Sequence, residues 1–198
     1  MSTAIHRITR ETRDIQESAD LLRQGILIEV NENNLMKIKA QVTGPEESCY
    51  EGGIFKVDIQ VPSDYPFRPP KCRFETKIWH PNVSSEGSIC LDILQSQWAA
   101  SMTLRSVLLS IQNLLYNPEP RDPLNPHVAI QYGRNEQMFR DTAKFWSQHY
   151  ANAQTPRDEA MWEKYKNLIS MGFHPHKVIA GLSINDWNEM RAVDECLQ

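Results

Sequence analysis

Four segments of alternating apolar and polar residues are the feature that most restricts how this chain can fold. They lie at residues 26–30, 37–42, 55–61 and 71–76. Alternation with a period of two is typical of β-strands that bury one face. The segments between them, NENN, TGPEESCYEGG and PSDYPFRPP, are rich in turn-forming residues. Because these links are short, the pattern predicts a four-stranded antiparallel meander with one face covered.

Segments of helical periodicity lie on both sides of the predicted sheet. Residues 3–19 predict an amphipathic helix, the nearest candidate to cover the sheet, with Thr12 as a gap in an apolar stripe of Ile5, Ile8, Ile15 and Ala19. Later helices are predicted from the Thr103 cap to Asn117-Pro118, from Asn125-Pro126 to Gly133, and over residues 135–150. Together with the strands they predict an α+β fold.

The last forty residues predict a second, smaller unit. The segment that begins ANAQTPR at residue 151 resembles a linker, so we expect domains at 1–150 and 158–198 with a linker at 151–157. Beyond it three short helices are predicted, from the Thr155-Pro156 cap to Met171, from Pro175 to Leu182 and from Asp186 to Leu197. They would form a three-helix bundle near the lower size limit for independent folding.

Composition limits the classes of function. The chain has 198 residues, of which 40% are apolar and 23% charged, and its net charge of −4 argues against attraction to nucleic acid or to an anionic membrane. No apolar run approaches the roughly 20 residues that span a bilayer. The N-terminus carries charges where a signal peptide would need an apolar core. These features predict a protein of the cytosol or the nucleus.

The four cysteines, at positions 49, 72, 90 and 196, include no CxxC pair. Structural zinc sites usually pair their ligands two to four residues apart, and a reducing compartment disfavours disulfides. We therefore expect four free thiols and no metal site. His174 and His176 remain a possible metal pair, although two histidines beside a proline are more often surface residues.

Cys90 lies in the stretch KIWHPNVSSEGSICLDIL, within an irregular region from residue 77 to 101. Irregular segments of this length are usually functional, although a lone cysteine is most often a small core residue. No lysine or arginine occurs between Lys77 and Arg105, so a strongly activated thiolate is not expected. A cysteine protease would need a nearby histidine base, and only His80 is local. A weakly activated thiol can still receive an acyl group that arrives as a thioester.

Two further residues are candidates for the second step, the attack of an amine on such a thioester. The side-chain amide of Asn82 could stabilise the oxyanion or fix the surrounding loop. The carboxylate of Asp122, in a second proline-rich loop, could orient the amine. Both residue types are also common turn formers.

The motifs together resemble the active-site region of ubiquitin-conjugating enzymes. The resemblance is carried by HPN at residue 80, then GSICLDIL and QWAASMTL, with YPFRPPKCRF and DPLNP in the same order and spacing. It covers about residues 3–150. The tail, with Met171-Gly172-Phe173 between its first two helices, resembles a ubiquitin-associated domain. The chain is similar to the small class of conjugating enzymes with this C-terminal extension.

The resemblance implies a catalytic group. Cys90 would accept the C-terminal glycine of ubiquitin from the activating enzyme, where ATP is consumed, so no cofactor is expected here. Asn82 would assist isopeptide formation, and Asp122 would position and help deprotonate the incoming lysine. Transfer to substrate or ubiquitin lysines would follow, with chains through lysine 48 of ubiquitin as the family precedent.

The resemblance also implies partner surfaces on a monomer. Phe67, Ala100 and Ser101 match the surface shared by ligases, and many members carry proline at the position of Ala100, which leaves the choice of ligase open. Arg7 and Arg10 match the basic face of the first helix that docks the activating enzyme. The alternative interpretation is that they form a solvated helix face without a partner. In the tail, the residues that would contact ubiquitin are Met171, Gly172, Phe173 and Leu197.

Two alternatives use the same fold. One is a non-catalytic ubiquitin adapter, which would lack the cysteine that this chain keeps. The other is an enzyme dedicated to a different ubiquitin-like protein, against which the tail argues. A redox enzyme or a cysteine protease would lack its second thiol or its local base here.

Overall fold

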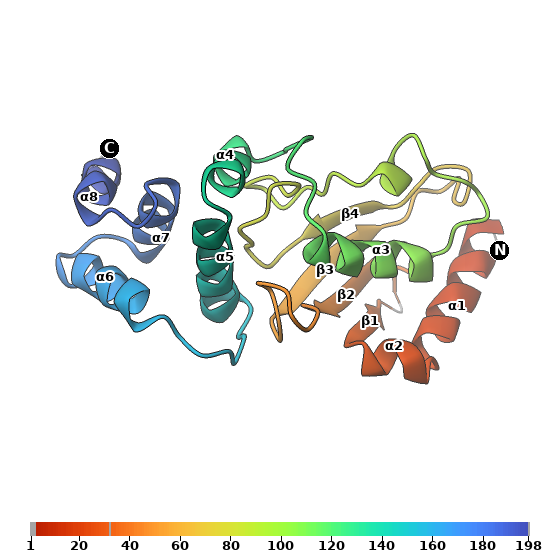
Figure 1. Cartoon of the computed structure of the whole chain (residues 1–198). Coiled ribbons are helices and arrows are strands. Elements are labelled where there is room, and N and C mark those ends of the chain that lie inside the picture. The colour runs from red at the N-terminus through yellow and green to blue at the C-terminus, as the bar shows by residue number, and fades with distance from the viewer. Residues whose placement is uncertain (1–2, 32, 198) are drawn as a thin grey trace.

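The structure is a computed structural model that describes residues 3–31 and 33–197 (Figure 1). The chain begins with helix α1, Thr3–Gln16, and the short helix α2, Ala19–Arg23. The predicted single helix to residue 19 therefore stops earlier. Ser18 has an extended backbone and its hydroxyl accepts the Leu21 N–H, which starts a new helix. Thr12, the expected gap in the apolar stripe, is buried because its hydroxyl donates to the Ile8 carbonyl.

The predicted antiparallel meander is confirmed. Strands β1, Ile26–Val30, β2, Lys37–Thr43, β3, Ile54–Gln60, and β4, Lys71–Phe74, pair in the order β1-β2-β3-β4. The register places Ala40 of β2 opposite Val57 of β3, both fully buried. The residues on either side of these two are exposed, apart from the half-buried Asp58, which is the alternation that the sequence shows.

Two helices cover the buried face of the sheet. Helix α3, Leu104–Tyr116, lies against β2, whereas α1 contacts β1 and α3 (Figure 1). The cover predicted for the first helix is thus shared, and α3 supplies the central part. Its start is fixed by a capping box, in which Thr103 and Ser106 bond each other's backbone N–H. Six apolar side chains of α3 are buried, as its broad apolar stripe predicts.

Between β4 and α3 the chain is largely irregular, as predicted. It contains two isolated β-bridges, Arg73 with Ser88 and Val83 with Ile89, and a single 3-10 turn, η1, Asp92–Leu94. Beyond α3, a proline-rich loop leads to α4, Pro126–Arg134, and α5, Glu136–Tyr150. Asn125 and Asn135 cap these helices by accepting backbone N–H groups.

The C-terminal helices are α6, Glu159–Ser170, α7, Pro175–Ile184, and α8, Glu189–Leu197. The predicted bundle is present, with two shifted helix starts. Helix α6 starts after Asp158, which accepts the Met161 N–H, rather than at the Thr155-Pro156 pair. Helix α8 starts three residues late because Asp186 and Trp187 adopt positive φ angles of 50° and 60°.

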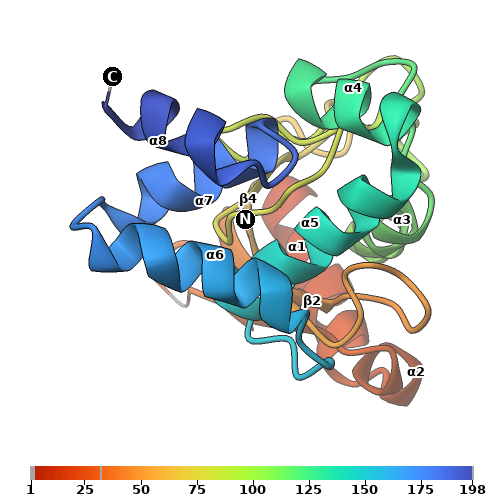
Figure 2. The ribbon, with the colours of Figure 1, turned by 60° about the vertical axis from the view of Figure 1, so that its left-hand side comes forward.

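The bundle packs against α5 rather than standing apart (Figure 2). Phe145 of α5 is buried among Trp162, Tyr165 and Trp187 of the tail, with ring centroids 4.6, 5.7 and 4.6 Å away. The Trp187 indole N–H donates to the Thr142 hydroxyl at 2.9 Å. These contacts join the two parts of the chain through a shared apolar cluster.

Polar contacts complete this junction. Gln131 of α4 accepts the Trp79 indole N–H and donates to the Ser183 carbonyl and the Asp186 carboxylate. Asp186 also pairs with Arg134. In residues 3–31 and 33–197 no helix combines the length and the apolar character that crossing a membrane would require.

Candidate active site

The His-Pro-Asn turn is built around a buried, neutral histidine. The His80 ring is fully buried, its Nδ1 accepts the Asn82 backbone N–H at 3.0 Å, and its Nε2 therefore carries the proton donated to the Leu114 carbonyl at 3.0 Å. Burial lowers the pKa of His80 to about 4. The ring is neutral at pH 7 and joins the turn to helix α3.

Asn82 uses every polar group of its side chain to hold the proline-rich loop at residues 117–125. It is 2% exposed, its Nδ2 donates to the carbonyls of Glu119 at 2.7 Å and Asp122 at 3.1 Å, and its Oδ1 accepts the Glu119 N–H at 2.8 Å. Of the two roles open to Asn82 from the sequence, this geometry supports fixing the loop.

Cys90 is tied to the same turn through the backbone. Its N–H donates to the Asn82 carbonyl at 2.9 Å, next to the bridge between Val83 and Ile89. The intervening turn depends on Gly87, whose φ is +86°. A Cβ at this position would lie only 2.1 Å from the Phe74 carbonyl oxygen, so another residue would clash there. The backbone thus fixes Cys90 relative to Asn82.

The thiol lies between a carboxylate and an amide. The Cys90 Sγ is 3.7 Å from the Asp122 Oδ2, to which it donates, and 3.7 Å from the Gln95 Nε2, which donates to it. Burial, followed by the charge of Asp122, raises the pKa of the Cys90 thiol. The half-buried thiol is therefore protonated at neutral pH, as expected from the missing lysines and arginines.

The other cysteines have no such setting. All four are free thiols, as predicted. Burial raises the pKa values of Cys49 and Cys72 to about 12 and that of Cys196 above its usual value. Within the described residues, no group of three or more His, Cys, Asp or Glu side chains is placed to hold a metal ion.

The residues predicted to bind ligases gather on two adjacent loops. Phe67 is 77% exposed, and Ala100 and Ser101 are also exposed. The loops are joined because the Trp98 indole N–H donates to the Pro66 carbonyl at 2.8 Å and its ring packs on Tyr65. An apolar side chain thus stands on a surface that the scaffold holds in place.

Arg7 and Arg10 have different environments. Arg10 is exposed, but the Arg7 guanidinium donates to the carbonyls of Ala100 and Met102 and to the Glu11 carboxylate, each at 2.7 Å. Arg7 therefore links α1 to the Ala100 loop, a role that its place in a row of arginines did not indicate.

The sequence does not indicate that Glu11 has a structural role, because a carboxylate four residues after an arginine usually belongs to a solvated helix face. Here it is 4% exposed and also accepts from the Tyr65 hydroxyl and the Leu104 N–H, each at 2.8 Å. It therefore joins α1 to the start of α3 and to the loop before Phe67.

The predicted ubiquitin-binding residues of the tail lie at its surface. Met171 and Leu197 are 61% and 71% exposed, Gly172 is exposed with a φ of +90°, and Phe173 is half-buried. The contacts with α5 use other tail residues, chiefly Trp162, Tyr165 and Trp187. Packing of the tail on α5 thus leaves Met171 and Leu197 open.

A family model described as ubiquitin-conjugating enzyme matches residues 7–147. The chain belongs to the ubiquitin-conjugating enzyme family. It is therefore an enzyme of the ubiquitin conjugation pathway, a family that works with ubiquitin, an activating enzyme and ligases. The resemblance seen in the HPN, GSICLDIL and YPFRPPKCRF motifs is confirmed at this level.

Relatives extend the match beyond the residues that the family model covers. The chain is 44% identical over 192 residues to human ubiquitin-conjugating enzyme E2 K, covering 96% of each chain. It is also 44% identical over 191 residues to Caenorhabditis elegans ubiquitin-conjugating enzyme E2 21, covering 96% of this chain and 89% of the relative. The solved E2 domain of a Toxoplasma gondii ubiquitin-conjugating enzyme is 41% identical with a TM-score of 0.66, and the match covers 74% of this chain and 97% of that one.

The neutral His80 predicts a specific loss of stability in acid. Its pKa is about 4 when folded, against roughly 6.5 for a free histidine, so between these values the unfolded chain binds more protons and stability falls as pH falls. From pH 7 to pH 5 this residue should remove about 2 kcal/mol from the free energy of unfolding. Urea unfolding at both pH values measures the loss.

The matched variant is His80→Gln, which keeps a polar side chain but does not titrate. It should lose about 2 kcal/mol less than the wild type between pH 7 and pH 5, whatever its stability at pH 7. His149 and His176, whose pKa values burial also lowers, contribute equally to both proteins and cancel. Equal losses in both proteins would contradict the neutral, buried state of His80.

Proposed function

We propose that Cys90 accepts ubiquitin as a thioester from the activating enzyme and passes it to lysine amines of substrates or of ubiquitin. The observation that carries the proposal is the half-buried Cys90 thiol, held 3.7 Å from the Asp122 carboxylate on a turn fixed by Asn82. A thiol that is protonated at rest is a poor target for oxidation, yet it can exchange with an existing thioester.

Asp122 acts on the incoming amine in this proposal. Its side chain is exposed and its carboxylate lies beside the sulfur, so a lysine that approaches the thioester carbonyl meets it. A carboxylate there orients the incoming amine and accepts a proton from its nitrogen as the C–N bond forms. Asn82 assists indirectly, because its side chain sets the position of the Asp122 carbonyl.

We propose that residues 1–150 are the catalytic domain, 151–157 the linker and 158–198 a ubiquitin-associated domain. The exposed Met171 and Leu197, with Gly172 and the half-buried Phe173, would contact an apolar patch of ubiquitin. A ubiquitin held there stays close to Cys90, which raises its effective concentration. Polyubiquitin chains, with lysine 48 as the linkage that the resemblance implies, would be the product.

The remaining surfaces are assigned to partners. Arg10 and the exposed part of the Arg7 side chain would dock the activating enzyme, whereas Phe67, Ala100 and Ser101 would bind ligases. We propose a monomer that works in the cytosol or the nucleus, uses no cofactor of its own, and depends on ATP through the activating enzyme. Nucleic acid and membranes are not among its proposed partners.

Loading of Cys90 tests the proposal directly. Incubation with activating enzyme, ATP and ubiquitin should give an adduct about one ubiquitin larger that disappears under reducing agent. Cys90→Ala should give no adduct, whereas Cys72→Ala, which removes another half-buried thiol, should load normally. Absence of an adduct with ubiquitin in the wild type would refute the proposal, and an adduct with a different ubiquitin-like protein would favour the alternative enzyme.

The tail is tested with a single exposed residue. Met171→Asp should lower the rate of diubiquitin formation about fivefold, because the effective concentration of the held ubiquitin is lost, while loading of Cys90 stays unchanged. Leu22→Asp is the matched control, since Leu22 is 63% exposed on α2, far from the tail (Figure 1). Unchanged chain formation in Met171→Asp, measured with purified components, would exclude this role.

A further inference from the structure

The sulfur of Cys90 needs a hydrogen-bond donor whenever it carries negative charge, and Asn82 cannot supply one. Both N–H groups of the Asn82 amide are used by the carbonyls of Glu119 and Asp122. Burial, and after it the charges of Asp122 and Asp92, raise the pKa of the thiol and so disfavour a thiolate. A donor supplied by the protein itself therefore has to be another residue.

Gln95 is positioned to make it. Its Nε2 donates to the Cys90 Sγ at 3.7 Å, which is within the usual range for a bond to sulfur. Its backbone N–H donates to the Asp92 carbonyl at 2.9 Å, which closes the η1 turn that begins two residues after Cys90. The half-buried Leu91 and Leu94 anchor that turn to the core. The amide therefore approaches the sulfur from a fixed segment.

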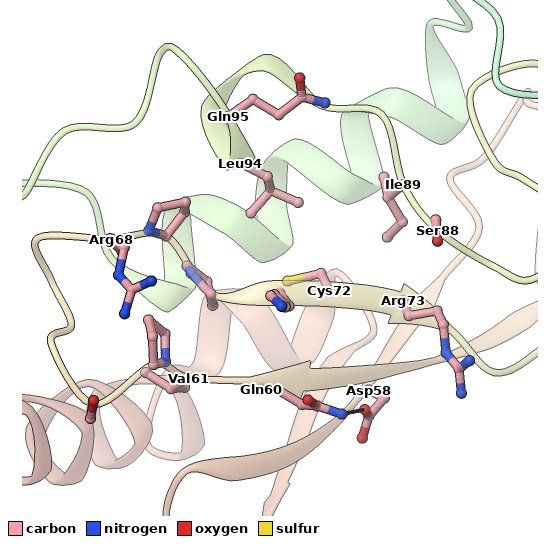
Figure 3. Close-up of a pocket in the computed structure, with 15 residues that line it drawn as sticks. Asp58, Gln60, Val61, Arg68, Cys72, Arg73, Ser88, Ile89, Leu94 and Gln95 are labelled. Atoms are coloured by element: carbon pink, nitrogen blue, oxygen red, sulfur yellow. Dashed lines mark hydrogen bonds between the residues drawn. The ribbon is translucent and has the colours of Figure 1, made fainter.

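An open groove of about 930 Å³ separates this segment from β4. Figure 3 shows Gln95 on the far side of the groove from Cys72, with its side chain running along the loop above Leu94 rather than down toward the strand. Gln95 is exposed, so a fold-stabilising role is a poor explanation for it. The contact between the Gln95 side chain and the Cys90 sulfur is the explanation that remains.

We propose that Gln95 is a catalytic residue whose side-chain N–H donates to the Cys90 sulfur as that sulfur becomes negatively charged, both in loading and in discharge. This inference rests on the proposed function, in which Cys90 carries the thioester. The hydrogen bond from a neutral amide stabilises the sulfur most while the sulfur is negatively charged. The amide carries no positive charge, so it does not ionise the resting thiol.

The bond changes define when Gln95 acts. In loading, Cys90 loses its proton to solvent, a bond forms from its sulfur to the ubiquitin carbonyl carbon, and the bond to the activating enzyme's sulfur breaks, with the electron pair leaving on that sulfur. In discharge, the lysine nitrogen bonds to the same carbon and gives up its proton to Asp122 or water. The bond to Cys90 breaks, and its sulfur leaves with the electron pair. The Gln95 amide lowers the energy of the negatively charged Cys90 sulfur twice, when it attacks in loading and when it leaves in discharge.

The test compares Gln95→Ala with Gln97→Ala, which removes the same side chain from an exposed neighbour whose hydrogen bond is through its backbone. Each variant is loaded with ubiquitin, the activating enzyme is stopped, and discharge of the thioester to free lysine is timed. Gln95→Ala should discharge about tenfold more slowly than wild type, since a hydrogen bond to a charged group has about that effect. Gln97→Ala should match wild type.

A second readout separates catalysis from folding. The pH dependence of Cys90 alkylation by iodoacetamide, followed by mass spectrometry of the Cys90 peptide, reports thiolate formation without ubiquitin. Its midpoint should move to higher pH in Gln95→Ala and further in Gln95→Glu, which adds negative charge beside the sulfur. Gln97→Glu, the charge-matched control, should show the smaller shift of the two glutamate variants.

Wild-type discharge and an unmoved alkylation midpoint in Gln95→Ala would overturn the inference, and so would equal slowing in Gln97→Ala. The proposed function fails differently, because then the wild type forms no ubiquitin adduct at Cys90. The alkylation series still tests the contact between Gln95 and the sulfur in that case, since it needs no ubiquitin.

Discussion

The hydrogen bonds of the buried Asn82 side chain hold together two parts of the chain that are nearly forty residues apart. They fix Glu119 and Asp122 of the proline-rich loop, and the Pro81 carbonyl accepts the N–H groups of Leu124 and Asn125 in the same loop. The Asn82 carbonyl in turn accepts the Cys90 N–H. A buried amide with all its groups satisfied is costly to disturb, so Cys90 and Asp122 face each other on a frame set by one residue.

This frame explains how a thiol without nearby positive charge can serve an enzyme of this family. The Cys90 thiol donates to Asp122, and burial and that carboxylate raise its pKa. In the proposed function, such a thiol stays protonated until the activating enzyme delivers ubiquitin as a thioester. The shortage of lysine and arginine, which looked unfavourable for a nucleophile, suits the carrier role that we propose for Cys90, because a carrier must not ionise early.

The sequence predicted the elements whose signals are local. Period-two alternation defined the four strands. Thr103 was recognised as a cap by its side-chain oxygen, and Asn125-Pro126 as a helix start by its proline. What it missed depends on contacts between distant residues. Nothing local indicates that Arg7 reaches the Ala100 carbonyl, that Phe145 sits inside the tail cluster, or that Gln95 touches the sulfur. The late start of α8 likewise follows from Trp187, which is buried beside α5.

Hydrogen exchange in Asn82→Ala is the most direct measurement of the central claim, that this side chain holds the Asp122 loop against Cys90. The variant leaves the Glu119 N–H and two carbonyls without their partner. We predict that backbone amides of residues 119–125 exchange about tenfold faster or more, while those of α3 keep wild-type rates. Wild-type exchange in the loop, or equal acceleration throughout the chain, would contradict the account.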